Sequence, residues 1–200
     1  MDVQFWFEFA STYSYPAAMR VQALAQARSR QVTWHAFALR PVFQAQGWND
    51  SPFNIYPVKG RYMWRDLERI CQAEQLPWLR PSQFPRNGYL PARVCAFYSQ
   101  QPWLPEFVRA VYRANFVEDR DISTAAVIAD CLKAAEQEPQ PCLAAAESEA
   151  AKQALRAHNA QATHLGLFGA PSFVVGDELF WGNDRLEQAL AWASAATEAQ

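Results

Sequence analysis

The sequence predicts an α/β fold in which a small sheet is interrupted by a large all-helical insertion, and three observations support this. Residues 3–38 have the patterns of a strand, a helix and a strand, which is the order of a βαβ unit. Residues 41–165 then carry mainly helical periodicity. Strand patterns return only at 172–181, before a last helix. This is the element order of a thioredoxin-like fold.

The first unit begins near the N-terminus. Apolar residues alternate with other residues along 3–9, which predicts the first strand. A polar break at 10–12 leads into a predicted helix over 13–28, which has small and apolar side chains along one side. A β-favouring run at 32–38 predicts the second strand. Because a helix joins these two strands, we expect them to be parallel, with a right-handed crossover.

The central block is predicted to be a loop followed by helices. Residues 41–60 contain three prolines and two glycines, which predicts a loop. Apolar spacing then predicts four helices, at about 62–71, 93–100, 105–116 and 123–135. Pro139 and Pro141 predict a break before a long Ala-rich helix at about 143–165.

The C-terminal part returns to the sheet. Strands are predicted at 172–175 and 179–181, joined by Gly176 and Asp177 in a tight hairpin turn. Asp184 is predicted to cap the last helix, with Glu187 three residues later as in a capping box. The predicted domains are a discontinuous thioredoxin-like domain at 1–40 and 150–200, and an inserted helical domain at 41–149.

Composition excludes several classes of protein. The chain has 200 residues, with 18 Lys and Arg against 20 Asp and Glu, and its net charge of −2 gives no electrostatic signal for nucleic acid or an anionic membrane. Half of the residues are apolar, which excludes a disordered chain. No run approaches the ~18 apolar residues that span a bilayer, and the N-terminus lacks a signal-peptide pattern.

Cysteine and histidine usage points away from redox and metal chemistry. The four cysteines form no CxxC pair and are predicted to be small apolar core residues, as in a reduced, cytoplasmic enzyme or binding protein. His35 lies in a predicted strand, whereas His158 and His164 are six residues apart on a predicted helix and face different sides. No metal site is predicted.

Ser11 is the first candidate for chemistry, because it lies between the first strand and the first helix. Unpaired N–H groups and the helix dipole favour negative charge at such a position. Disulfide oxidoreductases of this fold have a CxxC motif there, whereas residues 11–14 of this chain are Ser-Thr-Tyr-Ser and cannot exchange disulfides. Ser11 therefore either donates a hydrogen bond to a thiolate that a ligand brings, or only caps the helix.

Two further segments are expected at the same end of the sheet. A proline directly before a strand predicts a cis Ala170–Pro171 bond, which would leave the N–H and C=O of Ala170 free to pair with an extended peptide. The alternative is an ordinary trans proline that begins the strand. In residues 181–186, Asp184 either is a plain cap or accepts from a ligand ammonium group, while the helix N-terminus receives a carboxylate.

These segments resemble those of 2-hydroxychromene-2-carboxylate isomerases and the related kappa-class glutathione transferases. The resemblance extends over nearly the whole chain and rests on residues 5–9, 11–15, 54–66, 169–171 and 180–186. It implies that glutathione is the cofactor. Ser11 would contact the glutathione sulfur, Asn54 would line the site, and the backbone at Ala170–Pro171 would pair with the cysteinyl part. Asn183 and Asp184 would bind the γ-glutamyl end.

The same resemblance implies an enzyme that acts on a small aromatic substrate. Lys59 is a candidate partner for a carboxylate, and Thr12 replaces the proline that the family usually has after the serine. Aromatic residues are candidates for a flat apolar slot, although most are expected in the core: Phe5, Trp6, Phe7, Tyr13, Phe37, Phe43, Trp48, Trp64 and Trp181.

The implied reaction is a glutathione-dependent cis–trans isomerisation in aromatic-compound degradation. It converts 2-hydroxychromene-2-carboxylate to trans-o-hydroxybenzylidenepyruvate. Two alternatives are a kappa-like glutathione transferase that conjugates electrophiles and a non-catalytic thioredoxin-fold binding protein. The resemblance also implies a homodimer.

Overall fold

The computed structural model describes residues 1–45 and 47–198, and its centre is a four-stranded sheet in the order β2-β1-β3-β4. β1 (Val3–Phe7) pairs in parallel with β2 (Val32–Ala36) and antiparallel with β3 (Ser172–Val175). β4 (Glu178–Trp181) pairs antiparallel with β3. The predicted fold class, the parallel βαβ unit and the Gly176 hairpin are therefore confirmed.

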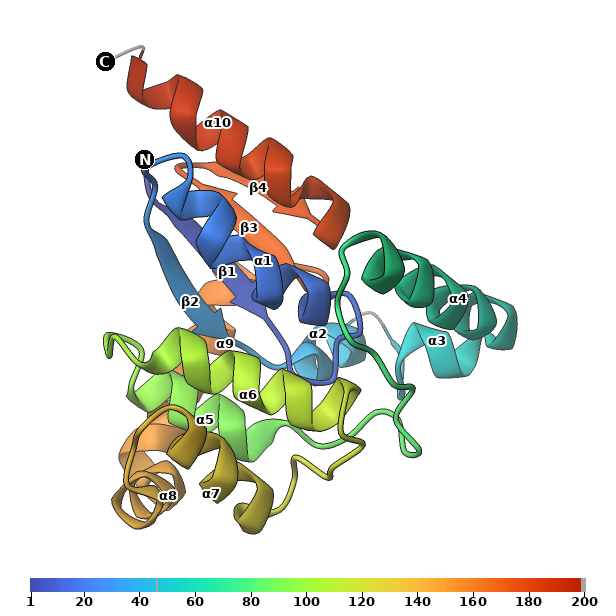
Figure 1. Ribbon diagram of the computed structural model, residues 1–200, viewed down its shortest axis with the longest axis vertical. Coiled ribbons are helices and arrows are strands. Elements are labelled where there is room, and N and C mark those ends of the chain that lie inside the picture. The colour runs from blue at the N-terminus through green and yellow to red at the C-terminus, as the bar shows by residue number, and fades with distance from the viewer. Residues whose placement is uncertain (46, 199–200) are drawn as a thin grey trace.

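Helices cover both faces of this sheet (Figure 1). α1 (Ser14–Gln26) and α10 (Leu186–Glu198) pack on the face to which Phe5 and Phe7 point. Trp6 points to the opposite face, where it packs near Ala162 of α9 (Glu149–His164). Because successive side chains of a strand alternate between the two faces, the aromatic run at the start of the chain contributes to both cores.

The remaining helices follow β2 in the sequence. α5, α6, α7 and α8 group together below the sheet, whereas α3 and α4 lie to one side of it (Figure 1). α5 and α9 both contact β2, and α6 contacts α1, so α5 joins this group to the sheet and α6 joins it to α1. Their bounds are α2 (Leu39–Ala45), α3 (Pro52–Ile55), α4 (Pro57–Ala73), α5 (Tyr89–Phe97), α6 (Leu104–Phe116), α7 (Ala125–Ala134) and α8 (Pro139–Glu147).

Two predictions about this block are wrong, and proline explains both. The range 41–60 is not a single loop, because α2 extends to Ala45 and Pro52 and Pro57 begin α3 and α4; residue 46 lies outside the described residues. The region 139–165 is not a break before one helix, since Pro139 begins α8, and Ser148 ends it and caps α9 by accepting from the N–H of Ala151. Proline suits the first turn of a helix, where its missing N–H costs no hydrogen bond.

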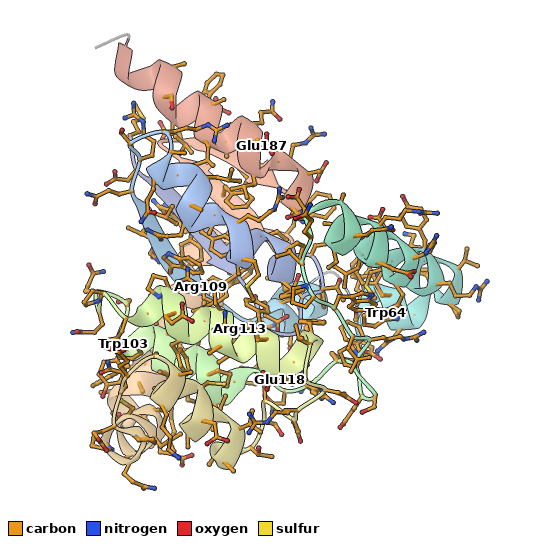
Figure 2. The ribbon with its side chains drawn as sticks, in the orientation of Figure 1. Trp64, Trp103, Arg109, Arg113, Glu118 and Glu187 are labelled. Atoms are coloured by element: carbon orange, nitrogen blue, oxygen red, sulfur yellow. The ribbon has the colours of Figure 1, made fainter. Side chains whose placement is uncertain are left out.

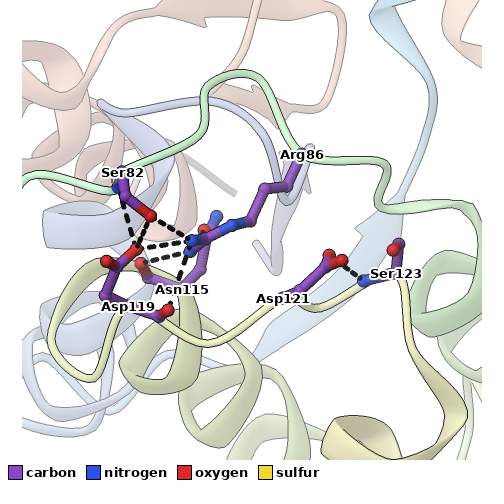
Figure 3. A network of polar contacts seen from close by, with 6 residues as sticks. All are labelled: Ser82, Arg86, Asn115, Asp119, Asp121 and Ser123. Carbon is purple, nitrogen blue, oxygen red and sulfur yellow. Dashed lines mark hydrogen bonds and ion pairs between the residues drawn. The ribbon is translucent and has the colours of Figure 1, made fainter.

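A buried arginine fixes the segment between α4 and α5 to α6 (Figure 3). Arg86 donates to the side-chain oxygen of Asn115 at 3.1 Å and to its carbonyl at 3.3 Å, and it forms an ion pair with Asp119. Asn115 donates in turn to the carbonyl of Phe9 at 3.2 Å. The segment that contains the cis Phe84–Pro85 bond is thus tied, through α6, to the chain that follows β1.

The four cysteines, Cys71, Cys95, Cys131 and Cys142, are buried and free, as expected of small core residues. Within residues 1–45 and 47–198, no helix combines the length and the apolar character needed to cross a membrane.

Candidate active site

A cavity of about 1170 Å³ lies at the end of the sheet where β1 leads into α1. The β1–α1 segment, the residues before β3, the residues after β4, and α2 to α4 all contribute to its wall. The structure brings seven predicted site residues to this cavity: Ser11, Thr12, Lys59, Ala170, Trp181, Asn183 and Asp184. Two others, Asn54 and Pro171, do not line it.

Ser11 lies in the turn that precedes α1. Its hydroxyl donates to the carbonyl oxygen of Ala170 at 2.8 Å and accepts from the N–H of Ser14, the first residue of α1, at 3.3 Å. The hydroxyl therefore caps the helix and also points across the cavity to the opposite segment. Its oxygen lies where the helix N-terminus favours an anion.

The Ala170–Pro171 bond is cis, as predicted, and it precedes β3 directly. The prediction that the carbonyl of Ala170 is free is wrong, because the Ser11 hydroxyl donates to it. A ligand that pairs with this carbonyl must therefore replace the serine as its donor.

The segment after β4 differs from its prediction. Asp184 does not cap α10, because a turn of 3₁₀ helix, Asn183–Arg185, comes between β4 and that helix. Gly182 begins this turn with a φ of 111°, a conformation that only glycine adopts easily. The side chain of Asp184 is consequently 74% exposed at the mouth of the cavity.

Asn183 is buried, and Arg20 of α1 determines how its amide is oriented. Arg20 donates to the side-chain oxygen of Asn183 at 3.1 Å, and it also pairs with Glu74. The Asn183 amide nitrogen is left as a donor toward the cavity that this residue lines. Sequence reasoning did not identify Arg20, because its partners are far away in the sequence.

The opposite wall comes from α3 and α4. The hydroxyl of Tyr13 donates to Asp66 of α4 at 3.0 Å, and burial together with Asp66 raises the pKa of this phenol. Lys59 lies in the first turn of α4, and its ammonium is 4.9 Å from the ring centre of Tyr56, the residue before this helix. Asn54 donates to the carboxylate of Asp50, which does line the cavity, so Asn54 contacts the site through this neighbour.

The aromatic candidates divide between the cavity wall and the core. Tyr13, Phe43, Trp48 and Trp181 line the cavity, whereas Phe5, Trp6, Phe7 and Phe37 are core residues. Three aromatic residues that were not predicted, Phe53, Phe84 and Phe168, also line it.

Trp64 of α4, labelled in Figure 2, does not line the cavity itself but packs against Phe84, which does. Its ring meets that of Phe84 edge-on, with 4.8 Å between ring centres, and stacks on Trp78 at 5.8 Å. A Cβ at Gly169 would overlap the Trp181 indole, so the indole can lie against the backbone beside Ala170 only because this residue is glycine.

Comparison with known proteins identifies the family. A model of the DsbA-like thioredoxin domain matches residues 2–191. This chain belongs to the DsbA-like thioredoxin family. A 2-hydroxychromene-2-carboxylate isomerase of Pseudomonas putida is 30% identical over 93% of this chain and 91% of its own.

Solved structures agree with that assignment. A 2-hydroxychromene-2-carboxylate isomerase matches with a TM-score of 0.87 and 26% identity, over 100% of this chain and 97% of that one. The cytosolic disulfide reductase DsbM from Pseudomonas aeruginosa, solved with GSH, matches with a TM-score of 0.67 and 17% identity, over 100% and 98% of the two chains. The second likeness concerns the fold alone, whereas the isomerase relatives support an enzyme of the isomerase class.

This member of the DsbA-like family lacks the chemistry of its disulfide oxidoreductases. Ser11 and Ser14 replace the paired cysteines, and the native cysteines are buried elsewhere. Burial raises the pKa of Cys71 and of Cys131 to about 11, so these two thiols are poor nucleophiles near neutral pH. A thiolate in this cavity has to come from a ligand.

Sequence reasoning missed the acid Glu8, and it considered His35 and His158 only as possible metal ligands. Glu8, directly after β1, lines the cavity, and burial raises the pKa of its carboxyl to about 7. The imidazole of His35 stacks on the indole of Trp6, with ring centres 4.5 Å apart, and lies 5.4 Å from that of His158. The only feature of the sequence that could have indicated Glu8 is that it is a single acid among the aromatic residues at 5–9. None of the three residues belongs to a cluster that could hold a metal ion, among the residues the structure describes.

Proposed function

We propose that this DsbA-like protein is a glutathione-dependent isomerase that converts 2-hydroxychromene-2-carboxylate to trans-o-hydroxybenzylidenepyruvate during aromatic-compound degradation. The observation that carries the proposal is the Ser11 hydroxyl, which lies at a helix N-terminus and faces Ala170 across a large cavity with an aromatic wall. The names of the isomerase relatives support the reaction class.

Binding of glutathione replaces the hydrogen bond between Ser11 and Ala170. The Ser11 hydroxyl turns from the carbonyl to the glutathione sulfur, and the cysteinyl N–H of glutathione then donates to Ala170 in its place. The sulfur anion is stabilised by this hydroxyl and by the N-terminus of α1. A free thiol has a pKa of about 8.5, and each unit by which it is lowered requires about 1.4 kcal/mol.

The rest of glutathione is assigned to the residues around this point. Asn183, oriented by Arg20, and Asp184 bind the γ-glutamyl end: the amide nitrogen donates to its carboxylate, and Asp184 accepts from its ammonium group. The ammonium of Lys59, which also lines the cavity, is assigned as the partner of a ligand carboxylate. Asn54 acts through Asp50.

The aromatic substrate is assigned to the space between Trp181 and the wall from α2, α3 and the 84–85 segment. Thr12 forms the floor beside the sulfur; its side chain is buried, and it keeps an N–H that proline would lack. An apolar slot of this kind suits a flat ring, and it excludes water from the reacting carbons.

The protein promotes rotation about a double bond by making that bond single for a time. In the ring-opened cis substrate, the thiolate adds to the carbon next to the aromatic ring, and the electron pair of the double bond moves into the conjugated ketone as an enolate. After rotation, the enolate re-forms the double bond and expels the thiolate. Glutathione is recovered, and no atom is gained or lost.

The test is calorimetric titration with reduced glutathione, with the wild type and Ser11→Ala compared under the same conditions. We expect saturable 1:1 binding by the wild type, with proton release that Ser11→Ala weakens or abolishes. Thr163→Ala, which removes an exposed hydroxyl of α9 outside the cavity, should bind as the wild type does. The absence of wild-type binding at millimolar glutathione would exclude both the isomerase and the transferase, and leave a thioredoxin-fold binding protein.

Product analysis separates the two enzymes. Glutathione is recovered quantitatively after isomerisation, whereas a kappa-like transferase consumes it in a conjugate.

We place the protein in the cytoplasm, because it needs a supply of reduced glutathione and its four cysteines are free. The homodimer stays a prediction, which sedimentation of the purified protein will test.

A further inference from the structure

Glu8 is a carboxyl group in the cavity to which the thiolate reaction gives no role. Two hydrogen bonds fix its main-chain position, because its carbonyl accepts from the N–H of Ser11 and from the hydroxyl of Tyr112, each at 2.9 Å. Glu8 lines the same cavity as Ser11, which follows it by three residues in the sequence. The carboxyl forms no ion pair with any basic side chain in residues 1–45 and 47–198.

The surroundings of Glu8 come from four segments. The N–H of Ala10 donates to its carboxyl, and Arg40 of α2 lines the same cavity. Burial raises the pKa values of the phenols of Tyr89 on α5 and Tyr112 on α6, and the nearby Glu8 charge raises them further. Arg93 of α5 acts on Tyr89 as well. Burial outweighs the Ala10 hydrogen bond and raises the pKa of Glu8 to about 7, so both protonation states are populated near neutral pH.

The substrate of the proposed function requires proton transfer before its double bond can rotate. The chromene is a cyclic hemiketal, in which one carbon carries a hydroxyl, a carboxylate and the ring oxygen. Ring opening breaks the bond from that carbon to the ring oxygen. The O–H electron pair of the hydroxyl becomes the second bond of the ketone, so the hydroxyl must lose a proton, and the phenolate oxygen that leaves must gain one.

We propose that Glu8 is the catalytic acid–base of this ring-opening step, with Arg40 binding the carboxylate on the same carbon; the inference rests on the proposed function. The Glu8 carboxylate accepts the hemiketal hydroxyl proton and then delivers it to the phenolate oxygen, so the residue ends in its starting state. Arg40 and Glu8 both line the cavity and both act on the phenol of Tyr89, so a cation and a carboxyl are available for the carboxylate and the hydroxyl that one substrate carbon carries.

The test compares Glu8→Gln on two substrates, of which one needs ring opening and the other does not. One is 2-hydroxychromene-2-carboxylate. The other is cis-benzylidenepyruvate, prepared by irradiating the trans isomer, which lacks the ortho hydroxyl and cannot cyclise. Glu8→Gln is expected to lower kcat on the chromene by roughly 100-fold and to leave the open-chain reaction within about twofold of wild type. The chromene pH profile should also lose its ionisation near 7.

Controls keep these outcomes distinct. Glutathione titration and circular dichroism show whether Glu8→Gln retains the site and the fold, and Glu8→Asp, which keeps the carboxyl, should restore part of the chromene rate. Glu178→Gln, an exposed change on β4, should behave as wild type. Equal slowing of both substrates, or of neither, would overturn the role of Glu8. A wild type inactive on both substrates would instead overturn the proposed function, and with it this inference.

Discussion

The Ser11 hydroxyl donates a 2.8 Å hydrogen bond to the carbonyl of Ala170, which lies 159 residues further along the chain. The same oxygen accepts from the N–H of Ser14. One side chain therefore caps a helix and also occupies the backbone carbonyl that an extended ligand would use. The two interpretations of Ser11 that the sequence left open, a helix cap and a ligand donor, do not exclude each other.

A cysteine at this position should report the electrostatics of the site. We predict that the thiol of Ser11→Cys has a pKa below the ordinary value of about 8.5, because the N-terminus of α1 favours the thiolate. Thiolate absorbance near 240 nm, recorded as the difference from wild type, measures it and subtracts the native cysteines. A pKa above 8.5 would contradict the thiolate site.

Glu8 should make stability depend on pH. Its folded-state pKa is raised from 4.5 to about 7, so the folded protein binds the proton more tightly than the unfolded chain does. The contribution of Glu8 to the free energy of unfolding should therefore be largest below pH 4.5. It should fall by up to about 3 kcal/mol as the pH rises through 7. Denaturant unfolding of Glu8→Gln from pH 5 to 8 should lack this component; the same slope in both proteins would refute it.

His35 should give the opposite slope. Burial, together with the neighbouring His158, lowers the pKa of its imidazole to about 4, so between pH 6.5 and 4 the unfolded chain takes up a proton that the folded protein does not. Stability due to this residue is therefore present above pH 6.5 and lost as the pH falls through 4. In His35→Gln, the free energy of unfolding should depend less on pH between 6.5 and 4 than in the wild type. The lost stacking on Trp6 should lower the free energy of unfolding by the same amount at every pH, so it does not affect this slope. An unchanged acid limb would contradict this.

Arg86 should matter more for stability than a surface arginine does. Arg86→Met removes hydrogen bonds to Asn115 and Asp119 from a buried site and should cost about 3 kcal/mol of unfolding free energy. It should also raise the KM for the aromatic substrate, because the 84–85 wall loses its tie to α6. Arg120→Met, which removes an exposed pair with Asp130, is the matched control and should cost much less. Similar costs in denaturant unfolding would show that the network has no special role.

Local sequence patterns predicted much of this fold. The alternation at 3–9, the β-favouring run at 32–38, the hairpin at Gly176 and the cis proline at 171 each depend on a few neighbouring residues, and the structure has β1, β2, the hairpin and the cis bond there. The errors arose where proline and aspartate have two local roles. Pro52 and Pro139 begin helices instead of interrupting them, and Asp184 lies in a 3₁₀ turn instead of capping α10.

The candidate site was harder to predict because its contacts join distant parts of the chain. Ser11, Asn183 and Asp184 were found from motifs, but nothing local pairs Arg20 with Asn183 or Tyr13 with Asp66. Glu8 was missed because a single acid in a predicted strand usually faces solvent, whereas in the structure this one lines the cavity and its carboxyl is buried enough to raise its pKa. Asn54 belonged to a matching motif, yet α3 directs its amide to Asp50.

The position of β1 between β2 and β3 has a consequence for synthesis of the protein. A chain leaving the ribosome presents β1 and β2 early, but the antiparallel neighbour of β1 is made only at residues 172–175. Until then, the β1 edge that β3 will cover lacks its partner, and Ser11 has no Ala170 to contact. The site is therefore assembled only after β3 has been made, and a chain released before residue 170 would lack β3, β4, α10 and the Ala170 side of the site.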